Sequence, residues 1–190
     1  MLRQKLIYKY IVLLFMMIFS TTISAQKFAQ KSNLLYLMTT TPNVGLEFYL
    51  GRQWTLDITT GYNPWRWSDN ASLKHWMVQP GLRFWPCRAF EGHFFEAHAL
   101  YSQYNVGNLP FFSSMEDRKY KGNMYGGGVA YGYHLPLKGR WAMEFTVGVG
   151  FLYMDYEKYT CRDCKESEGM YNRNYIGPTR LGVSIIYLIN

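Results

Sequence analysis

Two groups of residues in this sequence are of types that can do chemistry. The first is Cys161-Arg162-Asp163-Cys164, a C-x-x-C spacing found in redox pairs and in half of a zinc site. The second is a set of charged residues and one histidine that share one parity within alternating segments. Carboxylates beside a histidine are common components of acid–base catalysis. The members of this charged set are Glu47, Asp57, Arg83, Glu96, His98, Glu144 and Arg180.

The segments that carry the charged set alternate in residue type with a period of two. Within Trp141 to Tyr156 the odd positions are apolar or aromatic, and the even positions include Glu144 and Thr146. Such alternation predicts a β-strand with one apolar face. The sequence therefore predicts an all-β, antiparallel, up-and-down fold without a helix after the N-terminal segment, and a bulge at Pro80 because proline lacks a ladder donor. The eight strands are expected at residues 32–40, 44–50, 54–62, 75–85, 93–104, 123–137, 141–156 and 179–189.

The first 25 residues have the order of a secretory signal peptide. A basic start is followed by the apolar run Tyr10 to Phe19 and by the small and polar residues Ser20 to Ala25. A membrane anchor helix would need about 20 apolar residues, more than this run provides. We therefore expect residues 1–25 to be cleaved and residues 26–190 to form one barrel domain.

Composition narrows the functional classes. Aromatic residues make up 18 % of the 190 residues and 17 are glycine, which suits an all-β protein. Of 20 Lys and Arg residues, Arg3, Lys5 and Lys9 precede the expected cleavage point, which leaves 17 basic against 13 acidic side chains and a charge of +4. With no block of like charges and no basic helix, we expect no nucleic-acid partner, and we expect no cofactor.

The distribution of lysine and glycine favours a transmembrane barrel over a soluble one. A soluble, lipocalin-like barrel needs a water-facing surface rich in long polar side chains, whereas the lysines here fall in expected turns, loops or strand ends. Glycines line the small parity, which suits the cramped interior of an eight-stranded barrel. Aromatic residues recur near strand ends, and short connections alternate with longer ones, as in outer-membrane barrels. The predicted location is the outer membrane of a Gram-negative cell.

Within such a barrel the charged set has two interpretations. It could be acid–base machinery, but the sequence places no Ser or Cys nucleophile beside His98. The favoured interpretation is a plug of the lumen, in which opposite charges pack together and compensate each other's desolvation. Eight strands leave little free lumen, so an open channel is not expected.

The predicted outer loops hold the remaining candidates. Without a second C-x-x-C or a nearby histidine, Cys161 and Cys164 are expected to form a local disulfide, and Cys87 is expected to be a free thiol at the opposite end. Aromatic residues beside charges are typical contact anchors, although packing against the barrel rim is an equal alternative. The predicted surface contacts are Trp65, Trp67, Phe111, Phe112 and Tyr171.

Several segments resemble an uncharacterised domain-of-unknown-function family of Bacteroides-type bacteria. They include Lys31 to Tyr36, Thr41 to Phe48, Gly61 to Trp65, His75 to Pro80 and Tyr101 to Gly107. The resemblance implies a small, OmpA-like outer-membrane barrel, sometimes encoded near genes for surface fimbriae. It supplies no established catalytic residues.

The sequence thus favours a non-enzymatic outer-membrane barrel that contacts outer-membrane lipid and supports a surface appendage subunit or another envelope protein. Its oligomeric state stays open. One alternative is a lipid-modifying barrel enzyme, for which Asp69, Ser72 and His75 are the only outline of a catalytic set. The other alternative is a soluble ligand-binding barrel.

Overall fold

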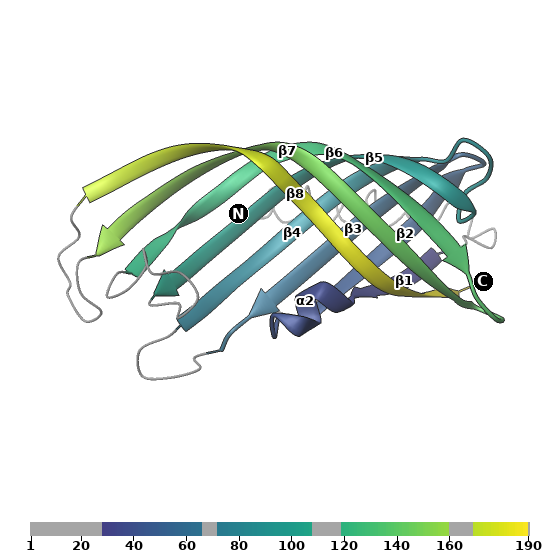
Figure 1. The fold of residues 1–190 in the computed structure, drawn as a ribbon, viewed down its shortest axis with the longest axis horizontal. Coiled ribbons are helices and arrows are strands. Elements are labelled where there is room, and N and C mark those ends of the chain that lie inside the picture. The colour runs from purple at the N-terminus through teal and green to yellow at the C-terminus, as the bar shows by residue number, and fades with distance from the viewer. Residues whose placement is uncertain (1–27, 66–71, 108–118, 160–168, 190) are drawn as a thin grey trace, which may run out of the picture.

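The protein is a closed antiparallel β-barrel in which each strand pairs with the next and β1 pairs with β8 (Figure 1). The computed structural model describes residues 28–65, 72–107, 119–159 and 169–189. The expected eight-stranded up-and-down barrel is confirmed. Its elements are β1 (Phe28–Asn33), α2 (Leu34–Met38), β2 (Asn43–Gly51), β3 (Trp54–Asn63), β4 (Ser72–Phe84), β5 (Gly92–Gly107), β6 (Lys119–Pro136), β7 (Trp141–Tyr159) and β8 (Gly169–Ile189).

The two ends of the barrel differ because the strands lengthen along the chain, from 6 residues in β1 to 21 in β8. Connections 52–53, 85–91 and 137–140 lie at one end, which we call the turn end, together with the start of β1 and the end of β8. We call the opposite end the loop end. There β5 to β8 extend well beyond β1 and α2 (Figure 1).

The first strand is displaced from its predicted position, and a helix follows it. The sequence predicts a strand at 32–40, whereas β1 ends at Asn33 and Leu34–Met38 form α2. The side-chain oxygen of Asn33 accepts a hydrogen bond from Leu35 N at 3.0 Å and so caps the helix. All five residues of α2 are apolar or aromatic, so they do not alternate, and leucine and methionine favour a helix.

The later strands run further than predicted at the loop end. The last strand begins at Gly169, ten residues before the expected start at Thr179, and the expected loops 105–122 and 157–177 shrink accordingly. Asn172 and Asn174 are exposed members of this extension. Polar residues occupy both faces of the extended hairpin, so it lacks the apolar alternation that identifies a half-buried strand.

The bulge predicted at Pro80 is wrong. Pro80 lies opposite Ile58, and the register between β4 and β5 is the same on both sides of it. A register shift occurs instead between β7 and β8, where Gly148 pairs with Arg180 but Val149 pairs with Pro178. The shift leaves Thr179 as the extra residue, next to a proline that cannot donate to the ladder.

Side chains pack the barrel interior in layers. The turn-end layer is apolar, the central layer is charged, and the layer towards the loop end is again apolar. The turn-end layer consists of Ala29, Trp85, Ala89, Phe90, Phe94, Ala142 and Ile186. The second apolar layer is built on Met77, Leu100 and Leu152. The only helix among the described residues, α2, is too short to cross a membrane.

Candidate functional site: an ion-pair network and a pocket at the mouth of the barrel

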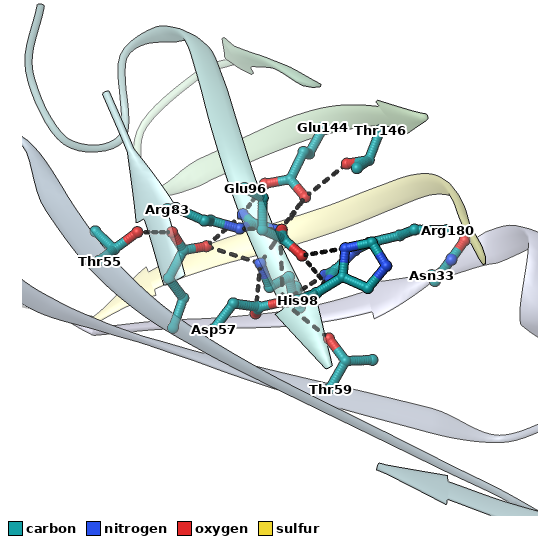
Figure 2. A network of polar contacts seen from close by, with 12 residues as sticks. Asn33, Thr55, Asp57, Thr59, Arg83, Glu96, His98, Glu144, Thr146 and Arg180 are labelled. Atoms are coloured by element: carbon teal, nitrogen blue, oxygen red, sulfur yellow. Dashed lines mark hydrogen bonds and ion pairs between the residues drawn. The ribbon is translucent and has the colours of Figure 1, made fainter. Parts of the chain in front are cut away.

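Charged side chains from most of the strands meet in the middle of the barrel interior (Figure 2). Alternate residues of a strand face opposite sides of the wall, and each predicted member occupies an inward, buried position. The register sets Glu47 opposite Asp57 and Arg83 opposite Glu96. All seven members of the charged set are at most 7 % exposed, and the structure brings them together.

Arg83 is the centre of this network. Its Nε donates to Glu96 Oε2 at 2.8 Å, and its Nη1 donates to Glu47 Oε2 at 2.8 Å. Nη1 and Nη2 hold Glu144 as a fork, at 2.7 and 3.0 Å. The guanidinium also lies 4.3 Å from the centre of the Phe94 ring, at the boundary with the turn-end layer. Bidentate, charge-assisted bonds of this kind are stronger than neutral hydrogen bonds.

Two further cations complete the network. Lys31 Nζ lies 2.7 Å from Glu47 Oε2 and 2.7 Å from Asp57 Oδ1. Arg180 donates to Glu96 and to Asp57. Each carboxylate of the network therefore contacts at least one cation, as buried charges require.

Lys31 is a member of the network that the sequence prediction missed. It is 5 % exposed, and its side chain lies inside the barrel and not in an expected loop or strand end. The expected first strand began one residue later, at Ser32. In β1, Ala29, Lys31 and Asn33 all face inward. The sequence predicts Lys31 at an inward position only if the first strand is taken to start at Phe28.

His98 has the neighbours of an acid–histidine–hydroxyl arrangement, but its acid is already engaged by two arginines. Its Nε2 lies 3.0 Å from Thr179 Oγ1, and its Nδ1 lies 3.7 Å from Glu96 Oε1. Glu96 is already held by Arg83 and Arg180. A cavity beside the network measures about 20 Å³, which accommodates one water molecule. The geometry therefore suits a packed ion-pair cluster better than a catalytic centre.

An apolar layer lies on each side of the network. On the turn-end side Trp85 is fully buried, and its Nε1 donates to Thr55 Oγ1 at 2.9 Å. On the other side Tyr36 of α2 packs against the cluster of Met77, Leu100 and Leu152. Helix α2 thus contributes an interior side chain in the half of the barrel that β1 does not reach.

A larger pocket lies at the loop end and is here called the mouth pocket. Its volume is about 750 Å³, and it is lined by residues of β3 to β8. One row of paired residues crosses five strands of its wall. This row is His75, Tyr104, Gly122, Tyr156 and Tyr171.

Two titratable groups of the mouth pocket are held neutral. Burial lowers the pKa of the His75 imidazole below its usual value, so the ring is uncharged near pH 7. Burial, reinforced by Tyr156 and Asp155, raises the pKa of the Tyr104 hydroxyl to about 12. The hydroxyl therefore keeps its proton at physiological pH and can donate a hydrogen bond.

The other predicted residues have separate locations. Trp65 is 50 % exposed and lies two residues after the end of β3, and Tyr171 belongs to the mouth pocket. Cys87 is exposed and free at the turn end. Within the described residues, no group of three His, Cys, Asp or Glu side chains could hold a metal ion. The predicted residues outside the described ranges are those of the signal peptide at 1–25, Trp67, Asp69, Phe111, Phe112, Cys161 and Cys164.

Comparison with known proteins gives a family without an assigned activity. No curated protein matches the chain significantly, and no solved structure does so either. A family model described as "Protein of unknown function (DUF3575)" matches residues 11–189, which is nearly the whole chain. The chain therefore belongs to the DUF3575 family.

Proposed function

We propose that this protein is a non-enzymatic outer-membrane β-barrel of a Gram-negative bacterium, with a plugged lumen and a loop end that contacts partners outside the cell. The observation that carries this proposal is the inversion of polarity across the wall. The ionised residues of the network are buried inside, whereas large apolar side chains are exposed outside. Examples are Val129 at 63 %, Val149 at 55 % and Phe95 at 53 % exposure. In a soluble protein so wide an apolar surface would be a liability.

Two bands of aromatic residues support the same proposal. Trp76 and Phe84 are eight positions apart in the sequence, and so are Tyr125 and Tyr133. That spacing corresponds to about 26 Å along a strand, or about 20 Å along the axis of a barrel with strands tilted by about 40°. The apolar band of outer-membrane barrels is about 25 Å tall.

The pairing of rings defines the two bands. At the turn end Trp54 packs on Phe84, and Trp141 packs on Tyr187, with centroids 5.1 and 5.0 Å apart. Towards the loop end Tyr125 packs on Tyr153 at 5.3 Å. Between the bands, the outward positions of the described strands hold no Asp, Glu, Lys or Arg. This surface suits acyl chains between two interfaces.

An outward groove has the same chemistry. It measures about 630 Å³ and runs along the outer face of the barrel from β3 to β7. Trp54, Leu82, Phe95, Val129 and Val149 are among its lining residues. Apolar walls of this kind favour contact with lipid chains over contact with water.

Cell fractionation tests the proposal. The protein is expressed with its N-terminal segment in a Gram-negative host, and the outer membrane is separated from the periplasm. We expect it in the outer-membrane fraction, with faster electrophoretic mobility unboiled than boiled, and with a mature N-terminus at Gln26. Recovery in the aqueous periplasmic fraction without a heat-dependent shift would support the soluble barrel instead.

An appendage subunit or another envelope protein is the proposed partner class. Its test is chemical crosslinking in intact cells followed by purification of the barrel from detergent extracts. Recovery of one specific appendage subunit, together with loss of the surface structure on gene deletion, is the expected result. Intact surface structures in the deletion strain would contradict this part of the proposal.

A further inference from the structure

The mouth pocket presents aromatic rings on neighbouring strands. His75, Tyr104, Tyr156 and Tyr171 lie in one register row, and Gly122 occupies the position between Tyr104 and Tyr156. The Tyr156 and Tyr171 rings are stacked, with centroids 6.1 Å apart. At Gly122 the backbones of β6 and β7 approach closely, because a Cβ atom there would collide with Asp155 O and lie 2.7 Å from Tyr156 Cα. The tyrosines of the row line the pocket on both sides of this glycine.

Polar groups of the same row lack partners among the described residues. The hydroxyls of Tyr104, Tyr156 and Tyr171 make no hydrogen bond to another described residue. A ligand that pairs with such a hydroxyl supplies the hydrogen bond that the described residues do not.

The charges of the pocket balance one another. Lys74 and Lys121 line it together with Asp155 and Glu157. Lys121 lies directly opposite Glu157 on the neighbouring strand, so this pair is positioned to compensate locally. With His75 neutral, the described lining residues carry no excess of either sign, and this balance favours an uncharged ligand.

We infer that the mouth pocket binds a neutral oligosaccharide. A pyranose ring has an apolar C–H face, which packs on an aromatic ring, and an edge of hydroxyls that both donate and accept hydrogen bonds. The rings of Tyr104 and Tyr156 match the first property, and the hydroxyls of Tyr104, Tyr156 and Tyr171 match the second. The volume of about 750 Å³ lies within the range of small-molecule sites, about 300–1,000 Å³.

This inference rests on the proposed function, because a loop end outside the cell would meet such sugars, yet its test does not depend on location. The purified full-length barrel, folded in detergent, is applied to an array of neutral, sialylated and sulfated oligosaccharides. We expect binding to at least one group of neutral structures. The affinity for the best of these is then measured by calorimetry.

Substitutions of individual tyrosines distinguish the loss of ring stacking from a loss of folding. Tyr104→Ala and Tyr156→Ala are expected to weaken binding by about tenfold or more, whereas Tyr156→Phe, which keeps the ring, loses about threefold or less. Tyr159→Ala on the same strand is the control, because Tyr159 does not line the pocket. A heat-dependent mobility shift shows that each variant is folded.

Three results would overturn the inference. The first is that the barrel binds no neutral oligosaccharide. The second is that it prefers the sialylated or sulfated structures. The third is that the folded Tyr104→Ala and Tyr156→Ala variants bind as well as the unmodified protein. None of these results touches the membrane proposal, which fractionation tests by itself. Conversely, a periplasmic, water-soluble barrel that binds sugar would contradict the proposed function and leave this inference intact.

Discussion

Arg83 is the residue on which the interior network depends most. It contacts Glu47, Glu96 and Glu144 and is fully buried. The network contains three cations and four carboxylates, so loss of one cation leaves a large excess of buried negative charge. Breaking a buried ion pair from one side costs about 3–5 kcal/mol, because the remaining partner is uncompensated.

We therefore expect Arg83→Met to lower the free energy of unfolding by about 3–5 kcal/mol, measured by urea titration of the barrel in lipid vesicles. Glu144→Gln keeps the shape of the side chain and relieves the negative excess, so its effect is smaller. Arg88→Met is the control, since Arg88 and Glu91 form an exposed pair. An Arg83→Met barrel as stable as the unmodified protein would refute the role given to the network.

The members of the charged set could be predicted at this scale, but their contacts could not. Parity within each strand is enough to place Glu47 and Glu144 on the inward face. Which carboxylate meets which cation depends on the register around the closed barrel, and no single strand encodes it. Lys31 shows the cost of a small boundary error, because a strand that starts at Ser32 leaves it outside the barrel.

At the scale of elements, Asn33 ends one element and begins the next. Its Oδ1 accepts from Leu35 N and Val183 N, and its Nδ2 donates to Leu181 O. The side chain thus caps α2 and continues the contact of β1 with β8 past the last paired residue. One asparagine therefore explains why the strand stops where it does.

Asn33→Ala removes the cap and both bonds to β8. We expect the free energy of unfolding to fall by about 1–3 kcal/mol, with faster amide hydrogen exchange in α2. Asn174→Ala, in an exposed part of β8, serves as the matched control. Unchanged exchange rates in α2 would show that tertiary packing and not the cap holds the helix.

Strands β6 and β7 approach each other closely at Gly128. A Cβ atom at this position would lie 2.3 Å from Val149 O, too close for backbone that cannot move aside. We expect Gly128→Ala to lower the free energy of unfolding by about 1–3 kcal/mol. Gly51→Ala should change it little, because a Cβ there meets nothing within 4 Å. Equal effects of the two substitutions would contradict this account.

The sequence predicts the strands well only within the apolar band. There one face is apolar and the other is small or polar, so the period of two is visible, as in Trp141 to Tyr156. Beyond the band both faces of β7 and β8 carry polar residues. No alternation of apolar and polar residues therefore indicates that β8 starts at Gly169. Leu34 to Met38 fail for the opposite reason, because every residue is apolar or aromatic. The register row of the mouth pocket lies in this less predictable part.

At the scale of the whole molecule, the interior layers support the proposal that the barrel is plugged and is not an open pore. Trp85 and Phe94 fill the turn-end side, and the charged network fills the middle. We expect no stepwise conductance when the folded barrel is inserted into planar lipid bilayers. A known open porin reconstituted in the same way is the positive control. Reproducible single-channel steps would show that the layers part in the membrane.

The central claim is that the outward face contacts lipid, and Val147 gives the most direct test of it. Val147 lies midway between Trp141 and Tyr153 and is 53 % exposed. The measurement is the free energy of unfolding of Val147→Arg in phosphatidylcholine vesicles, with Asn172→Arg outside the aromatic bands as the control. We predict a loss of about 2–4 kcal/mol for Val147→Arg and little change for Asn172→Arg, because an arginine near the bilayer midplane is costly. No loss for Val147→Arg would mean that this face meets water, and it would contradict the account.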